Sequence, residues 1–338
     1  MAELNIGIAG IGTYFPQKVE TAEALVESSG IPLKVLQEKM GIVQRHVAGE
    51  EDSISHMASE AARAAIADAG IDPAEIKMVI SHGSQYKDHI VWNSAGKIQE
   101  NIGAVNAFGY EMYALCAGAP IAMNIARSMM IADPALDTVL LAAGSKENDL
   151  ISPGNQRARF MFNFGAGGGA MILKRNHDKN LVLGASALTD GSLSETVMLT
   201  TEPEAIGEGG TEINGEVVGM LDVRNADYMA QRLGETSLPN FKRVMREALE
   251  KSGYTFEDVN FLGITHMKRS FFNQILEEIG LSQDQAVYLD HHGHIQSVDQ
   301  VLAIQLGLQQ GKIKDGDLLL LTGAGTGYTW SSIVVRWG

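Results

Sequence analysis

The stretch EAARAAIADAGIDPAEIKMVISH, residues 60–82, decides the fold, because it contains a helix, a turn and a buried strand in succession. Its apolar residues recur at helical spacing as far as Gly70, which ends the helix, and the run Met78–Ser81 is apolar enough to be buried on both faces. Residues 242–266 repeat this order, with the strand at Phe261–Thr265. The repeat predicts two similar α/β halves.

The rest of the chain extends the same alternation. A helix that begins after Asp52 or Ser53 leads to Gly70, and a second amphipathic helix is expected at Leu238–Leu249. The sequence therefore predicts an α/β fold whose halves, 1–175 and 176–338, pack about a pseudo-twofold axis. Outside the repeat, strands are expected at Ile6–Gly10, Thr138–Ala143, Ala170–Leu173, Leu181–Leu183, Leu318–Leu321 and Ile333–Val335.

Each half continues with a second pair of elements. Cys116 opens a helical pattern at Ala119–Met130, and His294 opens another at Val298–Gln309. Both helices lead into a strand that ends in glycine. We therefore expect Cys116 and His294 to occupy equivalent helix starts that face each other, with His266 close to them at the carboxyl end of its strand.

The only cysteine, Cys116, is the candidate nucleophile. The start of a helix offers the positive end of the helix dipole and unpaired N–H groups, which favour the thiolate. The alternative is a small buried apolar residue, which is the more common role of a lone cysteine. A single cysteine cannot form an internal disulfide, which fits a reducing compartment.

His266 and His294 are the candidate partners of this cysteine, and a core histidine bonded to the backbone is the alternative for each. His82, the counterpart of His266 in the repeat, is expected to be structural. The cluster His291, His292 and His294 could bind zinc, but its spacing is unlike that of helical metal pairs. No metal site is expected.

Two glycine-rich segments, 164–169 and 323–327, could suggest a dinucleotide site. Neither lies between a strand and a following helix, as a Rossmann phosphate site requires, so NAD is excluded. We expect close backbone crossings there, with an N–H of the second segment available to a developing oxyanion.

Composition narrows the possible partners. The chain has 338 residues, a formal net charge of −15 and 45% hydrophobic residues, so it can bury a large core but is not a candidate for nucleic-acid binding. Glu3 stands where a signal peptide would carry Lys or Arg, and no uninterrupted apolar run reaches the roughly 18 residues of a membrane span. A cytoplasmic protein without membrane partners is expected.

The residues resemble those of the β-ketoacyl-acyl-carrier-protein synthase III family of the thiolase superfamily. The resemblance covers nearly the whole chain. The motifs that carry it, in this order, are Gly10–Pro16, Gly41–His46, Ala114–Gly118, Phe164–Ala170, Thr265–His266, Asp290–His294 and Gly325–Trp330.

This resemblance implies a five-layered α-β-α-β-α fold, a homodimer, no metal or redox cofactor and a Cys-His-Asn triad. The cysteine and histidine of the triad correspond to Cys116 and His266. His294 replaces the asparagine of a His-Gly-Asn-Thr motif. The resulting Cys-His-His set is similar to that of the elongating condensing enzymes, and adds a group that titrates near neutral pH.

The resemblance also suggests binding residues. Trp92 aligns with an aromatic residue that closes the acyl pocket from across the dimer, and its size suggests a short acyl chain. Asn225 and Tyr228 align loosely with residues near the pantetheine arm. The adenine-stacking tryptophan expected between residues 30 and 40 is absent. The thioester carrier, coenzyme A or the phosphopantetheine of an acyl carrier protein, therefore stays open.

An acyl carrier protein is acidic, so its docking onto this acidic chain would need a local basic patch. Lys268 and Arg269 follow the histidine, and Arg157 and Arg159 precede the first glycine segment. The alternative is ordinary solvated surface charge.

The resemblance implies that Cys116 takes an acyl group from a thioester, with the carbonyl oxygen held by the N–H groups of Cys116 and of the loop at Thr326. A malonyl-type thioester then loses CO₂, and its enolate, stabilised by His266 and His294, attacks to give a 3-oxoacyl thioester. Two alternatives remain: acyl transfer to an alcohol or amine, and a catalytically silent subunit of a heteromeric synthase.

Overall fold

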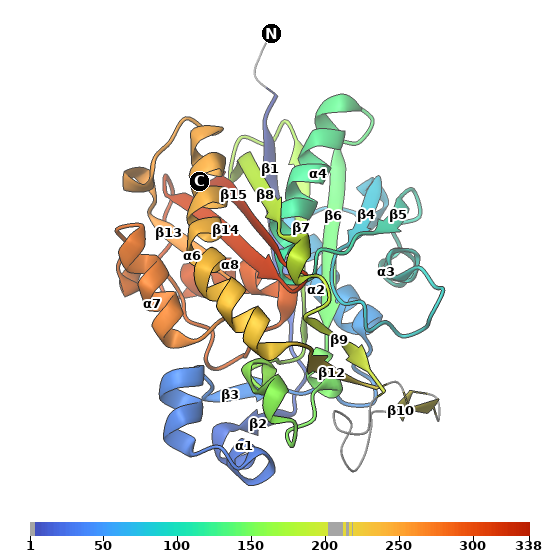
Figure 1. Ribbon diagram of the computed structural model, residues 1–338. Helices are drawn as coiled ribbons and strands as arrows, with labels where there is room; N and C mark the ends of the chain where they lie inside the picture. The colour runs from blue at the N-terminus through green and yellow to red at the C-terminus, as the bar shows by residue number, and fades with distance from the viewer. Residues whose placement is uncertain (1–3, 202–211, 214–215, 218) are drawn as a thin grey trace.

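The structure is a computed structural model that describes residues 4–201, 212–213, 216–217 and 219–338. Glu3, on which the expectation about a signal peptide rests, lies outside these residues. Nine strands form one sheet in the order β13-β14-β15-β8-β1-β7-β6-β4-β5, which runs from left to right in Figure 1. Their bounds are β1 Ile6–Tyr14, β4 Met78–Ser81, β5 Phe108–Glu111, β6 Thr138–Ser145, β7 Gly167–Arg175, β8 Leu181–Thr189, β13 Phe261–Ile264, β14 Leu318–Gly325 and β15 Thr329–Arg336.

Shorter pairs and the helices complete the described fold. The small antiparallel pairs are β2 (Val19–Thr21) with β3 (Gln44–His46), β9 (Val197–Thr200) with β12 (Met220–Val223), and β10 (Glu212–Ile213) with β11 (Glu216–Val217). The helices are α1 Ala22–Ser29, α2 Ile54–Ala69, α3 Ser94–Ile102, α4 Gly118–Ala132, α6 Ala226–Glu250, α7 Arg269–Glu278 and α8 Asp299–Gln309.

The helices form layers with the two parts of the nine-stranded sheet, which are β13-β14-β15-β8 and β1-β7-β6-β4-β5. Helix α2 packs on β1, β7 and β6, whereas α6 packs on β15 and β8. Between the two parts of the sheet lie α4, which contacts β8, β15 and β7, and α8, which contacts β13, β1 and β7. This sequence of layers confirms the predicted five-layered α-β-α-β-α fold. The division into domains 1–175 and 176–338 stays a prediction, with β7 ending at Arg175 and β8 beginning at Leu181.

Helix α2 shows how the sequence produces one of these contacts. Ser53 caps the helix by accepting a hydrogen bond from His56 N at 3.2 Å, and Gly70 ends it in the left-handed conformation. Its alanine-rich face lies directly on β1, where a Cβ at Gly12 would stand 2.3 Å from Ala61 O. The small residues on both sides therefore allow the helix backbone to approach the strand closely.

Helix α6 begins earlier than expected. It starts at Ala226 rather than Leu238, after Asn225, which adopts φ 50° and accepts a hydrogen bond from Tyr228 N. The helix continues through Pro239. A proline inside a helix usually ends or kinks it, so the presence of Pro239 favoured a predicted helix that begins at Leu238.

Strand pairing corrects the alignment of the internal repeat. His82 N donates to Ala142 O on β6, and Thr265 N donates to Thr322 O on β14, so the counterpart of His82 is Thr265 and not His266. The short 3-10 turns ahead of α4 and α8 begin at Leu115 and Gln296, so Ser297 and not His294 is the counterpart of Cys116.

One segment, Leu115–Ala132, has the length and hydropathy of a membrane span. It contains α4, whose side chains Ala122, Met123, Ala126 and Met130 are fully buried in the core between the two parts of the sheet. It is therefore a core helix.

Candidate active site

Cys116 lies in the 3-10 turn Leu115–Ala117, immediately before α4, and is buried. The preceding residue, Leu115, has φ 50°, a conformation that costs free energy in a residue with a branched side chain and that recurs at functional sites. Two glycines of β14 allow the chain to pass close by. A Cβ at Gly323 would stand 2.4 Å from Cys116 O, and one at Gly325 would stand 3.0 Å from Cys116 N. The close backbone crossing predicted for this segment is confirmed.

His294 approaches the cysteine from the loop before α8. Its Nε2 lies 2.9 Å from the Sγ of Cys116, and the ring of Phe164 packs edge-on against the imidazole. The backbone is held on both sides: His294 N donates to Asn163 O at 2.7 Å, and Gly165 N donates to His294 O at 2.9 Å. The first glycine segment thus positions the imidazole against the sulfur.

Asp299, the first residue of α8, completes this arrangement and was not identified from the sequence. Its carboxylate is fully buried. One oxygen, Oδ2, accepts a hydrogen bond from His294 Nδ1 at 2.6 Å and from the backbone N–H of His266 at 2.7 Å, and Oδ1 accepts from Ile295 N at 2.8 Å.

The electrostatics of His294 follow from these contacts. Burial lowers the pKa of His294, but the negative charges of Cys116 and Asp299 outweigh that effect and raise the pKa well above the ordinary value. An imidazolium between a thiolate and a carboxylate satisfies both ring nitrogens as donors. The site is therefore able to hold a nucleophilic sulfur in its reactive form.

His266 also lies in this buried region, and its ring is held in one orientation. Nε2 is 3.0 Å from the carbonyl oxygen of Gly41, the ring packs on Tyr288, and the buried Nδ1 has no protein partner. Burial lowers the pKa of His266 to about 4, so the ring is neutral near pH 7. Because a carbonyl oxygen only accepts, Nε2 carries the proton and Nδ1 presents a lone pair.

His82 is part of the structural framework behind the nucleophile. Its Nδ1 lies 3.1 Å from Ser297 Oγ, and the same hydroxyl donates to His82 O at 2.9 Å. The backbone passes close to α4, where a Cβ at Gly118 would stand 2.8 Å from His82 O. These contacts support the structural role expected for His82.

Titration of His82 leads to a prediction for stability. Burial lowers its pKa from 6.5 to about 4, so the unfolded chain binds this proton more readily than the folded chain. Its contribution is complete above about pH 6.5 and is lost as the pH falls toward 4. The free energy of unfolding of the parent protein should fall between about pH 7 and about pH 5. In His82→Asn this fall should be smaller by about 2 kcal/mol, as measured by urea unfolding.

Ser297→Ala is the matched control for this experiment, because it removes the hydrogen-bond partner and leaves the titrating group. It should lower the free energy of unfolding at both pH values. An unchanged pH dependence in His82→Asn would contradict the assignment.

The candidate binding residues have various surroundings. Trp92 lies in the loop between β4 and α3, edge-on to His89. Asn225 uses its side chain to cap α6, and Thr326 lies in the turn between β14 and β15, directly after Gly325. Their roles stay predictions.

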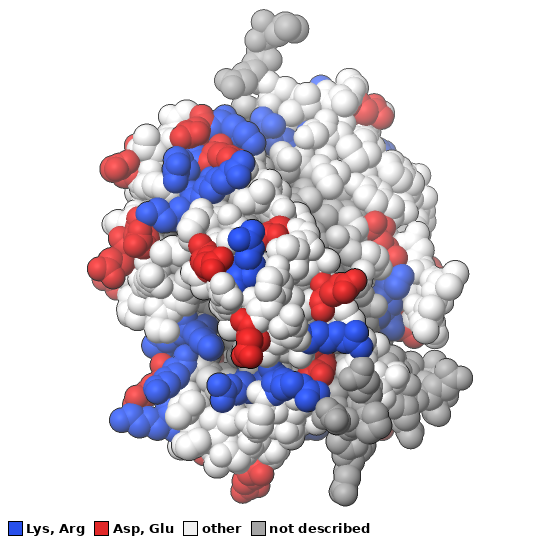
Figure 2. All heavy atoms as spheres, viewed as in Figure 1, with Lys and Arg blue, Asp and Glu red and all other residues white. Residues whose placement is uncertain are grey.

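The basic residues separate into two groups. Arg157 forms a two-pronged ion pair with Asp222, and Arg269 pairs with Asp290 at 2.7 Å while stacking on Tyr288. Arg159 and Lys268 instead line a pocket of about 780 Å³. It lies between the α1 segment and α7, where Figure 2 shows Lys and Arg side chains around a hollow. Two of its lining residues connect it to the site along the chain. Met40 immediately precedes Gly41, and Lys268 follows two residues after His266.

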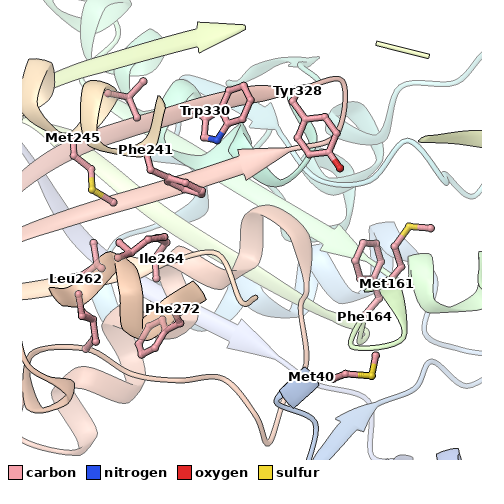
Figure 3. Packing of buried hydrophobic residues seen from close by; sticks show 14 of the residues in the cluster. Met40, Met161, Phe164, Phe241, Met245, Leu262, Ile264, Phe272, Tyr328 and Trp330 are labelled. Carbon is pink, nitrogen blue, oxygen red and sulfur yellow. The ribbon is translucent and has the colours of Figure 1, made fainter. Parts of the chain in front are cut away.

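Apolar side chains lie next to the reactive groups, since the ring of Phe164 contacts His294. Figure 3 shows Met161 beside Phe164, with Tyr328 above them and Met40 below. All four belong to one core cluster. Burial and the charge of Cys116 raise the pKa of Tyr328, so this phenol stays neutral.

Across the described parts of the chain, no group of three or more His, Cys, Asp or Glu is arranged to hold a metal ion. His291 pairs with Asp290, whereas His292 packs against His46 and Phe15.

Comparison with known proteins identifies the family. A model of 3-oxoacyl-[acyl-carrier-protein] synthase III matches residues 110–191, and a model of the C-terminal part of the same family matches residues 249–337. Together they cover about half of the chain. The synthase III of Bacillus anthracis is 29% identical over 99% of this chain and all of its own length, and that of Rickettsia rickettsii is 27% identical over 98% and 99%. The chain belongs to the 3-oxoacyl-ACP synthase III family of the thiolase superfamily.

Solved structures agree on the fold. The synthase III of Aquifex aeolicus superposes with a TM-score of 0.84 at 24% identity, over 98% of this chain and all of that one. Xanthomonas campestris OleA, solved with lauric acid and lauroyl-CoA, superposes at 0.82 with 18% identity, over 98% of this chain and 99% of that one. The family models and the full-length relatives confirm the predicted membership of the synthase III family, and this member is an acyltransferase of the condensing type.

Proposed function

We propose that the chain forms a 3-oxoacyl thioester by decarboxylative Claisen condensation through an acyl-Cys116 intermediate. The observation that supports it best is the contact of 2.9 Å between Cys116 Sγ and His294 Nε2. The close fit between these two groups gives no support to a catalytically silent subunit. The family relationship supplies the reaction class, and the catalytic roles of Cys116, His266 and His294 are part of the proposal.

The reaction has two steps. Cys116 thiolate attacks the acyl thioester, and the departing thiolate takes the proton of the His294 imidazolium. The proposal assigns stabilisation of the oxyanion to the N–H groups of Cys116 and of the Thr326 turn. A malonyl-type thioester then loses CO₂, and its enolate carbon attacks the acyl carbonyl and expels Cys116. His294 regains a proton from solvent after the first step, so that its Nε2 N–H stabilises the enolate, and His266 does so once its ring turns or gains a second proton.

One observation favours a second candidate, acyl transfer to an alcohol or amine without decarboxylation. His266 already donates from Nε2 to Gly41 O, so its unpaired Nδ1 is an acceptor in the neutral ring. An acceptor nitrogen suits removal of a proton from an incoming hydroxyl or amine. For condensation, the ring must instead turn or gain a second proton before it donates to an enolate.

The two candidates differ in what they release. With an acyl-CoA and a carboxyl-labelled malonyl thioester, condensation releases labelled CO₂ and forms a 3-oxoacyl product in equal amounts. Acylation of Cys116 without CO₂ release, followed by ester or amide formation with added alcohols or amines, would favour the second candidate.

The pocket between α1 and α7 is the proposed entrance for the thioester arm of coenzyme A or an acyl carrier protein. Its cations include Lys39, Arg159 and Lys268, which complement a phosphate or an acidic carrier. No ion-pair partner of Arg159 or Lys268 lies in the part of the chain that the structure describes.

Reversing two of these charges tests the entrance. Arg159→Glu with Lys268→Glu should raise KM for a phosphate-bearing thioester about tenfold or more, because two attractions become repulsions. A pantetheine thioester without phosphate should be affected less. Lys314→Glu, on the turn before β14, is the control. Equal effects on both substrates would contradict this assignment.

A homodimer is the proposed assembly. Strand β5 is an edge of the sheet, and the apolar side chains of Ile90, Val91, Val105 and Phe108 near it are exposed. Antiparallel pairing of β5 with a second copy would cover them and bring Trp92 toward the partner's site. The cytoplasm is the proposed compartment.

Phe108→Glu, on the edge strand, should convert this dimer into a monomer, because two buried charges would face each other across the axis. Light scattering after gel filtration measures the change. Leu308→Glu, an exposed apolar position on α8, is the control. A monomeric parent protein, or a dimer that survives Phe108→Glu, would contradict the interface.

A further inference from the structure

We propose that Asp299 is a positioning residue that holds His294 as an imidazolium against Cys116, which gives a Cys-His-Asp relay. The inference rests on the proposed role of Cys116 as the acyl acceptor. It starts from the carboxylate, whose Oδ2 lies 2.6 Å from His294 Nδ1 on the side of the ring opposite Cys116.

The surroundings of Asp299 allow a buried carboxylate to keep its charge. An isolated buried charge is costly, but here three N–H groups, from His294, His266 and Ile295, donate to the two oxygens. Asp299 is also the first residue of α8, an 11-residue helix, where the dipole favours a negative charge. Across all the residues that the structure describes, no Lys or Arg forms an ion pair with Asp299, so the imidazole is its charged partner.

The consequence concerns both nitrogens of His294. A carboxylate that accepts from Nδ1 fixes the proton there and aims Nε2 at the sulfur. The charge of Asp299 also favours a second proton on Nε2, which stabilises the thiolate before acylation. That same proton is then available to the departing thiolate.

A second, structural role of Asp299 has to be separated from this one. The Oδ2 atom also binds the backbone N–H of His266, and the next residue, Gln300, donates to Thr265 Oγ1 and Thr322 O. Loss of the carboxylate could therefore loosen the loop after β13. A purely structural role predicts lower stability without a change in how the thiol titrates.

Alkylation of the single cysteine separates the two roles. Iodoacetamide labelling followed by intact mass reports on Cys116 alone, because the chain has one cysteine. At about pH 6, Asp299→Asn should react roughly tenfold or more slowly than the parent protein, and its pH profile of alkylation should be displaced upward, because the imidazolium beside the sulfur is no longer held. Asp299→Glu, which keeps the charge, should restore most of the profile.

Asp317→Asn is the matched control, because that carboxylate also binds a backbone N–H, on the turn before β14. It should leave the profile unchanged. An Asp299→Asn profile identical to that of the parent protein, with only a lower midpoint of unfolding, would overturn the proposal.

A measurement on the parent protein avoids any dependence on folding of the variants. Proton–nitrogen spectra of histidine-labelled protein should show both ring nitrogens of His294 still protonated at a pH above the ordinary histidine pKa of 6.5. A neutral His294 there would also overturn the proposal. Neither test needs an acyl substrate, so a failed acyl transfer would reject the proposed function and leave the role of Asp299 separately measurable.

Discussion

Cys116→Ala is expected to abolish acyl transfer, with turnover reduced about 10⁴-fold or more, because no other group can form the covalent intermediate. The chain has no second cysteine, and Ser297, the counterpart of Cys116 in the repeat, uses its hydroxyl on His82. The measurement is the rate of CO₂ release and of 3-oxoacyl product formation. Decarboxylation without condensation can persist, because both histidines proposed to stabilise the enolate remain.

The alanine variant should fold normally. Cys116 is small and buried, and alanine removes one sulfur atom and its contact with His294, so the midpoint of unfolding should change by only a few degrees. Turnover above about 1% of the parent rate in Cys116→Ala would contradict the covalent mechanism.

His294→Ala is expected to have the second largest effect, a fall of roughly 10²- to 10³-fold in the rate of Cys116 acylation. The variant removes the proton that the departing thiolate needs and leaves Asp299 buried without its imidazolium. The measurement is single-turnover formation of the acyl adduct, followed by mass.

His266→Asn distinguishes the two reaction candidates. Its amide can still donate to an enolate oxygen but cannot accept a proton. Condensation should therefore survive at a measurable rate, whereas transfer to an alcohol or amine, which needs the acceptor Nδ1 of His266, should be lost. Equal loss of both reactions in this variant would show that proton transfer through His266 is essential to condensation as well.

Much of the fold could be predicted because it depends on periodic signals. The apolar run at Met78–Ser81 and the capped helix Ile54–Ala69 form as expected. Some strands are longer than predicted. For example, β1 continues past Gly10 to Tyr14 through glycine and polar residues, and this part of the strand packs against α2. Sheet register likewise depends on pairing between distant strands, and it corrected the alignment of the repeat.

The site was only partly predictable, for the same reason. Sequence reasoning brought Cys116 and His294 together, and the structure places them in hydrogen-bond contact. Asp299 was missed because an acid at the first position of a helix usually caps it locally, and only the fold turns its carboxylate toward His294. The orientation of His266 depends on Gly41, which is 225 positions away in the sequence.

The basic residues near the entrance illustrate a further limit. Arg157 and Arg269 looked equivalent to Arg159 and Lys268 in sequence, but Asp222 and Asp290 neutralise the first two. These partners lie on other elements. Charge available to a ligand is therefore a property of the folded surface.

The most direct test of the account is the intact mass of the protein after brief exposure to a panel of acyl-CoA species, with peptide mapping of the adduct. We predict an added mass of one acyl group, located on Cys116 and absent from Cys116→Ala. A protein that gains no acyl group from any thioester, or gains it elsewhere, would contradict catalysis through an acyl-Cys116 intermediate.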